Sequence, residues 1–261
     1  MRRTFFILMT CLAIIAWSSA VVRAKVKKVP YTKIDVNIEE AYTPDAAFQA
    51  MSNAFGEAVA RKDSPVLFAL VGPTFIWTSQ GAPAEAFDLG RDALHNFKVL
   101  FGFREVGKDT DGGVQDGPFW EVLASFAQDG TYYKAADNLV CSPILGVISE
   151  EKKFEDAHKK IAADETVSWY FTFADNNLTK GPTDATQVGK FSKQVLPVLS
   201  VYPPRTGEEP APPVTHLEVL MPSGKAGWIP LSAARPLETD RLCYAATPSG
   251  QWRIVLYDQP G

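Results

Sequence analysis

Apolar residues recur at helical spacing through the first half of the chain, and they alternate with polar residues through the second half. From Phe48 through Phe55 to Val59, the apolar side chains fall on one face of a helix that is expected to end near Arg61. The segment Thr43-Pro44-Asp45 combines a hydroxyl cap, a proline for the first turn and an acid, so it predicts the start of that helix.

The same spacing predicts further elements up to about residue 163. Helical segments are expected at 66–71, 91–101, 118–128 and 150–163, and strands at 74–78 and 138–144. From Thr166 onward, short alternating segments are separated by turns rich in glycine and proline. This change of period predicts an α+β fold in which a helix-rich α+β domain at 40–163 precedes an all-β small barrel at 164–261. Residues 25–39 show no period, and we expect an extended, partly disordered arm.

The first 24 residues have the pattern of a secretory signal peptide. Arg2 and Arg3 precede an apolar run from Phe5 to Trp17, and small residues lead to an exit at Ala24 or, as second choice, Ala20. The alternative is a retained membrane anchor, but the run is shorter than the roughly 20 residues that a spanning helix needs. We therefore predict a periplasmic or secreted protein with no stable membrane anchor after cleavage.

The charge of the chain argues against partners that are polyanions. The whole chain has 26 Lys and Arg against 30 Asp and Glu; removing residues 1–24 takes away three arginines and gives 23 − 30 = −7. A protein of this charge is repelled by nucleic acid and by anionic lipid, so no nucleic-acid partner is expected.

Two of the three cysteines, Cys141 and Cys243, lie beyond the signal peptide. An even number of cysteines in an oxidising compartment predicts a disulfide, which would connect the two expected domains. The alternative is a pair of buried free thiols. Cys141 could also be the nucleophile of a cell-envelope cysteine peptidase, but Val140-Cys141-Ser142-Pro143 lacks the Asp-Cys-Ser pattern of the NlpC type.

Two stretches of the C-terminal half resemble the bacterial SH3-like domain. They are Asn177–Pro182 with Val188–Phe191, and the hairpin Pro222-Ser223-Gly224-Lys225-Ala226-Gly227-Trp228-Ile229-Pro230. The end of the chain is similar to uncharacterised secreted proteobacterial proteins that carry this module. The resemblance implies a groove for an extended peptide, and its candidate residues are Tyr202, Trp228, Trp252 and Tyr257. The alternative is that Trp228 and Trp252 fill the core.

The N-terminal half has a fainter resemblance to the nuclear-transport-factor-2-like α+β cone. It is carried by Phe48-Gln49-Ala50, Ala58–Asp63 and Phe75-Ile76-Trp77. Under this interpretation the domain would bind a small ligand in an apolar pocket. The pocket would be lined by Phe55, Phe75, Trp77, Phe97 and Trp120.

No sequence pattern indicates a metal or a cofactor. His95, His158 and His216 are far apart in sequence, and no glycine-rich phosphate loop is present. The loop 107–117 resembles a calcium loop, but position twelve, counted from Asp109, is Trp120 instead of the bidentate glutamate. We therefore predict a periplasmic, non-enzymatic binding protein whose partner is a cell-wall peptide or an envelope protein. A cysteine-type envelope hydrolase and a small-ligand cone are the alternatives.

Overall fold

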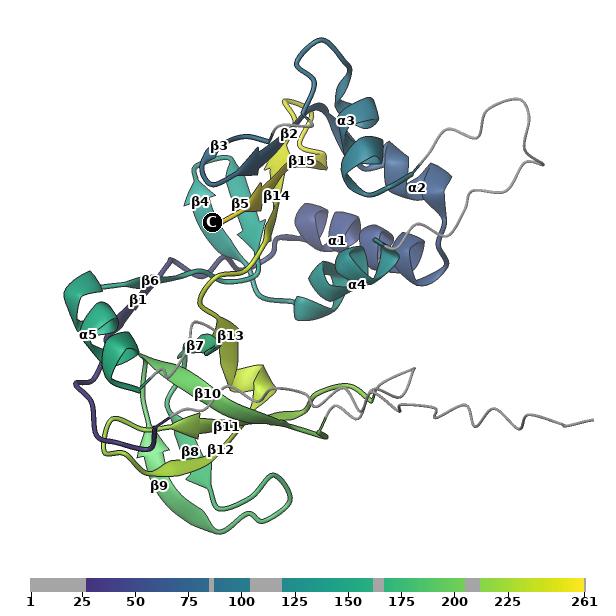
Figure 1. Cartoon of the computed structure of the whole chain (residues 1–261). Coiled ribbons are helices and arrows are strands. Elements are labelled where there is room, and N and C mark those ends of the chain that lie inside the picture. Colours follow the sequence, from purple (N-terminus) through teal and green to yellow (C-terminus); the bar gives the residue numbers. More distant parts are fainter. Residues whose placement is uncertain (1–26, 85–86, 104–118, 162–166, 205–211, 261) are drawn as a thin grey trace, which may run out of the picture.

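The computed structural model describes residues 27–84, 87–103, 119–161, 167–204 and 212–260. Within these ranges the chain forms a six-stranded sheet, a seven-stranded sheet and a two-stranded sheet, together with five α-helices (Figure 1). The expected α+β fold class is therefore confirmed. The two signal-peptide cleavage sites and the calcium-like loop 107–117 lie outside the described residues.

The helices lie close to their predicted positions. They are α1 (Ala46–Ala60), α2 (Ser64–Ala69), α3 (Ala93–Leu100), α4 (Trp120–Asp129), α5 (Glu151–Ile161) and the 3-10 turn η1 (Leu231–Ala233). Aspartate side chains cap the first three. Asp45 Oδ1 accepts a hydrogen bond from the backbone N of Phe48 at 2.7 Å, and Asp63 and Asp92 cap α2 and α3 in the same way. Asp45, two residues closer to the apolar stripe, is the cap of α1 rather than Thr43.

The six-stranded sheet combines strands from both ends of the chain, in the order β3-β2-β15-β14-β5-β4. These strands are β2 (Val71–Ser79), β3 (Ala82–Pro83), β4 (Tyr133–Ala136), β5 (Leu139–Ser142), β14 (Arg241–Ala246) and β15 (Trp252–Gln259). β15 runs parallel to β2, and the other neighbours are antiparallel. The C-terminal hairpin β14–β15 thus lies in the middle of the N-terminal sheet, and assigning it to the C-terminal barrel was wrong.

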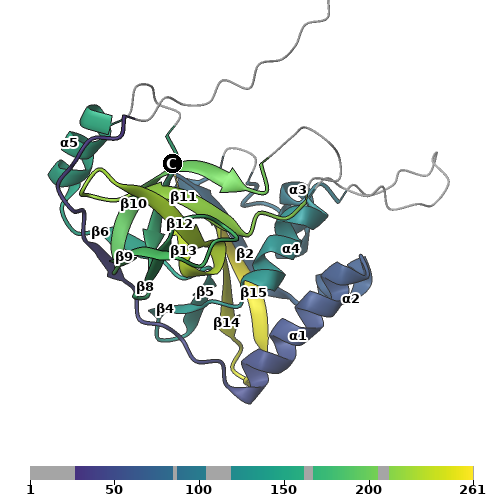
Figure 2. The ribbon, with the colours of Figure 1, turned by 90° about the horizontal axis from the view of Figure 1, so that it is seen from below.

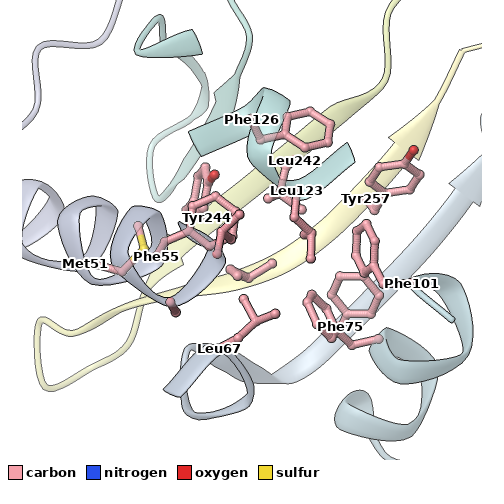
Figure 3. Packing of buried hydrophobic residues seen from close by; sticks show 14 of the residues in the cluster. Met51, Phe55, Leu67, Phe75, Phe101, Leu123, Phe126, Leu242, Tyr244 and Tyr257 are labelled. Carbon is pink, nitrogen blue, oxygen red and sulfur yellow. The ribbon is translucent and has the colours of Figure 1, made fainter. Parts of the chain in front are cut away.

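The core of this region is rich in aromatic rings (Figure 3). Side chains from α1 to α4 pack against one face of the six-stranded sheet. Phe97 is fully buried and lies edge-on to Phe75, with 5.3 Å between ring centroids. Phe48 makes a similar contact with Trp252 of β15 at 5.0 Å. Because Trp252 belongs to the C-terminal hairpin, this core requires both ends of the chain.

The seven-stranded sheet contains the rest of the C-terminal half, in the order β13-β7-β10-β11-β12-β8-β9. Its strands are β7 (Trp169–Thr172), β8 (Asn176–Thr179), β9 (Gln187–Phe191), β10 (Gln194–Tyr202), β11 (His216–Leu220), β12 (Ala226–Pro230) and β13 (Ala234–Pro236). The hairpin β11–β12 turns at Gly224, whose φ of 80° suits glycine. In the described residues this sheet ends at β13 and β9 and is not a closed barrel.

The arm that precedes α1 is ordered over the part that the structure describes, residues 27–39. β1 (Val36–Ile38) pairs with β6 (Gly146–Ile148), and Ile34 bridges to Val195 of the seven-stranded sheet. The hydroxyl of Tyr31 donates to the carbonyl of Leu220 at 2.8 Å. The extended arm is present as expected, and Tyr31, Ile34 and Val36 fix these residues to the rest of the protein because their side chains are buried.

The arm, α5 and facing strands of both sheets share one apolar cluster. It includes Ile34 of the arm, Ile161 of α5, Phe171 of β7 and Cys243 of β14. α5 lies beside the arm and away from the other helices (Figure 1, Figure 2), and its Ile161 carbonyl accepts a hydrogen bond from the backbone N of Lys27. A polar contact adds to this junction: Arg235 Nε lies 2.6 Å from Asp129 Oδ2, and both side chains are 14% exposed.

Candidate ligand-binding face

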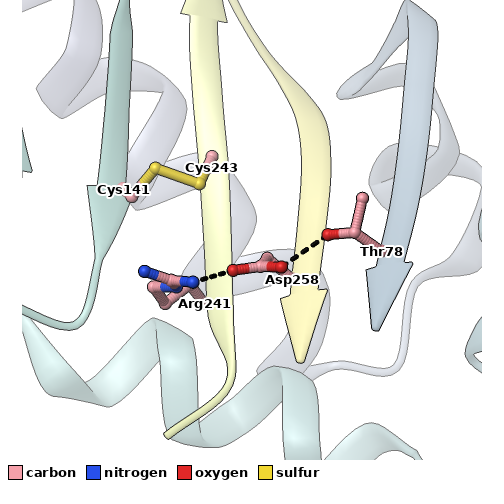
Figure 4. Close-up of a disulfide and its surroundings, with 5 residues drawn as sticks. All are labelled: Thr78, Cys141, Arg241, Cys243 and Asp258. Carbon is pink, nitrogen blue, oxygen red and sulfur yellow. Dashed lines mark hydrogen bonds and ion pairs between the residues drawn. A yellow bond between two sulfur atoms is a disulfide. The ribbon is translucent and has the colours of Figure 1, made fainter. Parts of the chain in front are cut away.

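Cys141 and Cys243 form the predicted disulfide (Figure 4). They lie directly opposite each other on the neighbouring strands β5 and β14, with Cα atoms 4.0 Å apart. The bridge therefore cross-links two strands of one sheet instead of joining two separately folded domains. Both residues are 2% exposed. A sulfur held in a disulfide is not a thiolate, so this arrangement gives Cys141 no nucleophilic role.

A row of polar side chains crosses the same sheet close to the disulfide (Figure 4). Thr78 Oγ1 donates to Asp258 Oδ1 at 2.5 Å, and Arg241 forms an ion pair with the other oxygen of Asp258. Each charge in the row has a partner. These mutual contacts explain the row as a structural link between β2, β15 and β14.

The pocket expected among the N-terminal aromatic residues is filled by those residues themselves. Phe55, Phe75, Phe97 and Trp120 are between 0% and 6% exposed and belong to one continuous core. Trp77 is partly buried against it, and its Nε1 donates to Gln259 Oε1 at 3.1 Å. A filled core counts against the small-ligand interpretation of this region.

The structure separates the four residues of the predicted groove into two pairs. Trp252 and Tyr257 lie on β15 of the six-stranded sheet, where they are 8% and 3% exposed in its core. The hydroxyl of Tyr257 donates to Asp240, and burial raises the pKa of Tyr257 above its usual range. These two residues are therefore core residues, and placing them in a groove beside Tyr202 and Trp228 was wrong.

Tyr202 and Trp228 meet on the outer face of the seven-stranded sheet. Their ring centroids are 6.4 Å apart and the ring planes are nearly perpendicular, at 88°. Tyr202 lies at the end of β10 and Trp228 on β12, so the two rings meet across the intervening strand β11. Both side chains are half-buried. An edge-to-face pair of this kind is a preferred aromatic geometry and leaves ring surface open to a ligand.

Strand register identifies the neighbours of this pair. Directly opposite residues on antiparallel strands point to the same face, and Tyr202 pairs with His216 while Trp228 pairs with Glu218. Leu217 of the same strand is buried in the core beneath. We call this surface the aromatic face, and it comprises Ser200, Tyr202, His216, Glu218, Trp228 and Pro230. The alternation of polar and apolar residues along 216–219 would have indicated Glu218, which the sequence analysis did not single out.

Charged and polar groups lie beside the two rings. Glu218 accepts a hydrogen bond from Ser200 Oγ at 2.8 Å, and its other oxygen lies 3.5 Å from Lys28 Nζ of the arm. His216 Nδ1 lies 3.0 Å from Thr215 Oγ1. The face therefore presents a carboxylate, an ammonium and an imidazole around an apolar centre.

Two features of neighbouring strands hold Trp228 in place. Thr179 Oγ1 of β8 donates to the Trp228 carbonyl at 3.2 Å. Gly227 lets β12 approach β8 closely, since a Cβ on this residue would lie 2.4 Å from the Leu178 side chain. Gly227 is thus required by packing beside the half-buried Trp228.

Within the described ranges, no group of three His, Cys, Asp or Glu side chains is placed to hold a metal ion. No helix in the same ranges is long and apolar enough to cross a membrane. No protein family, curated protein or solved structure matches this chain.

Proposed function

We propose that this chain is an exported, non-enzymatic binding protein whose aromatic face contacts an extended peptide of the cell wall. The export signal is the pattern of residues 1–24. The binding residues are Tyr202 and Trp228, with His216 and Glu218 between them. The observation that carries the proposal is the meeting of two half-buried rings on an outer sheet face, across a strand that contributes polar side chains.

The chemistry of the face supports a peptide ligand. Aromatic rings bind extended peptides by covering apolar side chains and the flat surfaces of peptide groups. Cell-wall peptides also carry free amino and carboxylate groups, which Glu218 and Lys28 complement. A segment of an envelope protein would share the extended backbone but not necessarily the free charged groups.

Parts of the fold support the two family resemblances on which the proposal draws. The hairpin β11–β12, with its turn at Gly224, supports an SH3-like module within residues 169–236. The six-stranded sheet with α1 to α4 on one face supports a cone-like frame. In this interpretation the SH3-like module is inserted into the frame, and β14–β15 complete the frame afterwards.

The proposal is tested by replacing the two rings and measuring retention on purified peptidoglycan sacculi. Trp228→Ala and Tyr202→Ala are each expected to weaken binding about tenfold or more, because aromatic residues that a ligand covers carry most of the energy of such contacts. Leu89→Ala is the matched control, since Leu89 is 85% exposed and lies outside the face. Thermal unfolding of each variant verifies that the fold is retained.

Two results would contradict this proposal. In one, the parent protein is not retained by sacculi; in the other, both ring variants bind as well as Leu89→Ala. The parent protein could instead fail to bind sacculi but capture an envelope protein in a way that depends on Trp228. In that case the aromatic face binds a protein segment, and the proposal of a cell-wall peptide as ligand is wrong.

A further inference from the structure

A cleft lies between α5 and the edge of the seven-stranded sheet, and none of the residues that line it belongs to the aromatic face. It has a volume of about 440 Å³, within the usual range for small-molecule sites. α5 contributes Phe154 and His158, β7 contributes Trp169, and Glu238 follows β13. Ser168, just before β7, is exposed at its edge.

Three rings form one wall of the cleft. Phe154 lies edge-on to Trp169, with 4.9 Å between ring centroids. His158, one helical turn after Phe154, lies 6.0 Å from Trp169 at a tilt of 31°. Residues four apart share one face of a helix, so α5 turns both rings towards the same tryptophan. This wall suits a flat or apolar group.

Trp169 also has an unused hydrogen-bond donor. The residue is 8% exposed, and its indole Nε1 is buried without a partner. A buried N–H without an acceptor costs about 1–3 kcal/mol, so such a group calls for an explanation. Trp77 provides the contrast, because its Nε1 donates to Gln259 Oε1 at 3.1 Å. This atom has almost no exposed surface, so an oxygen of a ligand in the cleft supplies the missing acceptor only when the atoms that cover Nε1 move aside.

The remaining polar groups narrow the class of ligand. Glu238 is exposed and lines the cleft, so it offers a partner to an ammonium group. His158 offers a second polar contact from α5. An oxygen acceptor, an apolar body and an amine occur together in an amino acid.

We propose that this cleft binds an apolar amino acid, free or as the end of a short peptide. The side chain lies against Phe154 and His158, an oxygen of the carboxyl or carbonyl group accepts from Trp169 Nε1, and the amine faces Glu238. The site does not depend on the aromatic face, so either one can fail without the other.

The test follows the tryptophan indole N–H signals of the ¹⁵N-labelled protein by NMR, assigned with Trp169→Phe and Trp77→Phe. The probes are phenylalanine, phenylalanine amide, N-acetylphenylalanine and the dipeptide Ala-Phe. Phenylalanine and its amide are expected to shift the Trp169 signal saturably and to leave the Trp77 signal in place. N-acetylphenylalanine is expected to bind about tenfold more weakly, because it lacks the ammonium that Glu238 would contact.

Two variants sharpen the result. Glu238→Gln should lower the affinity for phenylalanine to that for N-acetylphenylalanine, and Ser168→Phe should fill the cleft and abolish the shifts. Tighter binding of Ala-Phe than of phenylalanine would identify a peptide end as the ligand, and the reverse order a free amino acid. The proposal is overturned if no probe moves the Trp169 signal, if Trp77 moves equally, or if Ser168→Phe changes nothing.

Discussion

The two large sheets differ in how they are covered. One face of the six-stranded sheet lies beneath four helices and an aromatic core, and a buried disulfide links two of its strands. The seven-stranded sheet has one mainly aliphatic core cluster, whose one buried ring is Phe191, and its other buried rings, Trp169 and Phe171, belong to the cluster at the junction with the six-stranded sheet. Its outer face leaves Tyr202 and Trp228 half-exposed.

Under the proposed function, this difference is a division of roles. The six-stranded sheet buries its aromatic residues inside and cross-links strands from the two halves of the sequence, which favours stability. The seven-stranded sheet places two aromatic residues outside, which favours recognition. The junction between the sheets contains the arm, α5 and the ion pair Arg235–Asp129, so these contacts hold the seven-stranded sheet against the six-stranded one.

Removal of the disulfide tests the stabilising role of the six-stranded sheet and has the largest expected effect. The double variant Cys141→Ala, Cys243→Ala should lower the free energy of unfolding by about 4–5 kcal/mol, because the bridge spans 102 residues of sequence. Urea denaturation of parent and variant measures the difference. A loss below about 1 kcal/mol would show that the sheet does not depend on its cross-link.

Breaking the ion pair at the junction should have a smaller effect. Asp129→Asn leaves the Arg235 guanidinium without its carboxylate in a site where both groups are 14% exposed. We expect a loss of about 1–3 kcal/mol in unfolding free energy. Asp35→Asn is the matched control, because the pair Lys33–Asp35 is about half exposed and should matter little. If the two substitutions had equal effects, the ion pair Arg235–Asp129 would not be what stabilises the junction.

Alkaline pH probes the buried arm through Tyr31. Burial raises the pKa of Tyr31, so above its usual value of about 10 the unfolded chain loses this proton while the folded protein keeps it. The contribution of Tyr31 to the free energy of unfolding is therefore fully present at neutral pH. Above a pH of about 10 it declines by about 1.4 kcal/mol per pH unit. Tyr31→Phe should make the decline shallower by that amount, as denaturation at a series of alkaline pH values would show. An unchanged slope would mean that the arm does not bury this hydroxyl in solution.

The elements predicted best are those that neighbouring residues determine. The apolar stripe of α1 runs through Phe48 and Phe55, and a single aspartate side chain caps its start. The turn of β11–β12 follows from Gly224 and its neighbours. In each case the residues that determine the element lie within a few positions of one another. The local sequence pattern is therefore enough to predict the element.

Contacts between distant segments were not predictable in the same way. Alternation marks 252–257 as a strand, but it does not identify β2, about 180 residues earlier, as its parallel partner. Gly72 was expected to separate the helical segment 66–71 from the strand 74–78, yet it lies within β2, where a Cβ would be 3.0 Å from the Val255 side chain. The predicted disulfide did indicate where the C-terminal hairpin lies, because a bond to Cys141 places the strand of Cys243 beside β5.

The candidate site was half predicted for the same reason. Family resemblance pointed to Trp228, and the structure places Tyr202 against it. Trp252 and Tyr257 were assigned to the groove because their sheet was misassigned. Phe154, His158 and Trp169 come together only when α5 packs on β7, a contact that no local pattern shows.

The most direct test of the division of roles is to map binding of a soluble cell-wall muropeptide on the ¹⁵N-labelled protein by NMR. The account predicts saturable chemical-shift changes centred on Tyr202, His216, Glu218 and Trp228, with the amides of β2 and β15 unaffected. Changes centred on the six-stranded sheet and its helices, or no changes at all, would contradict it.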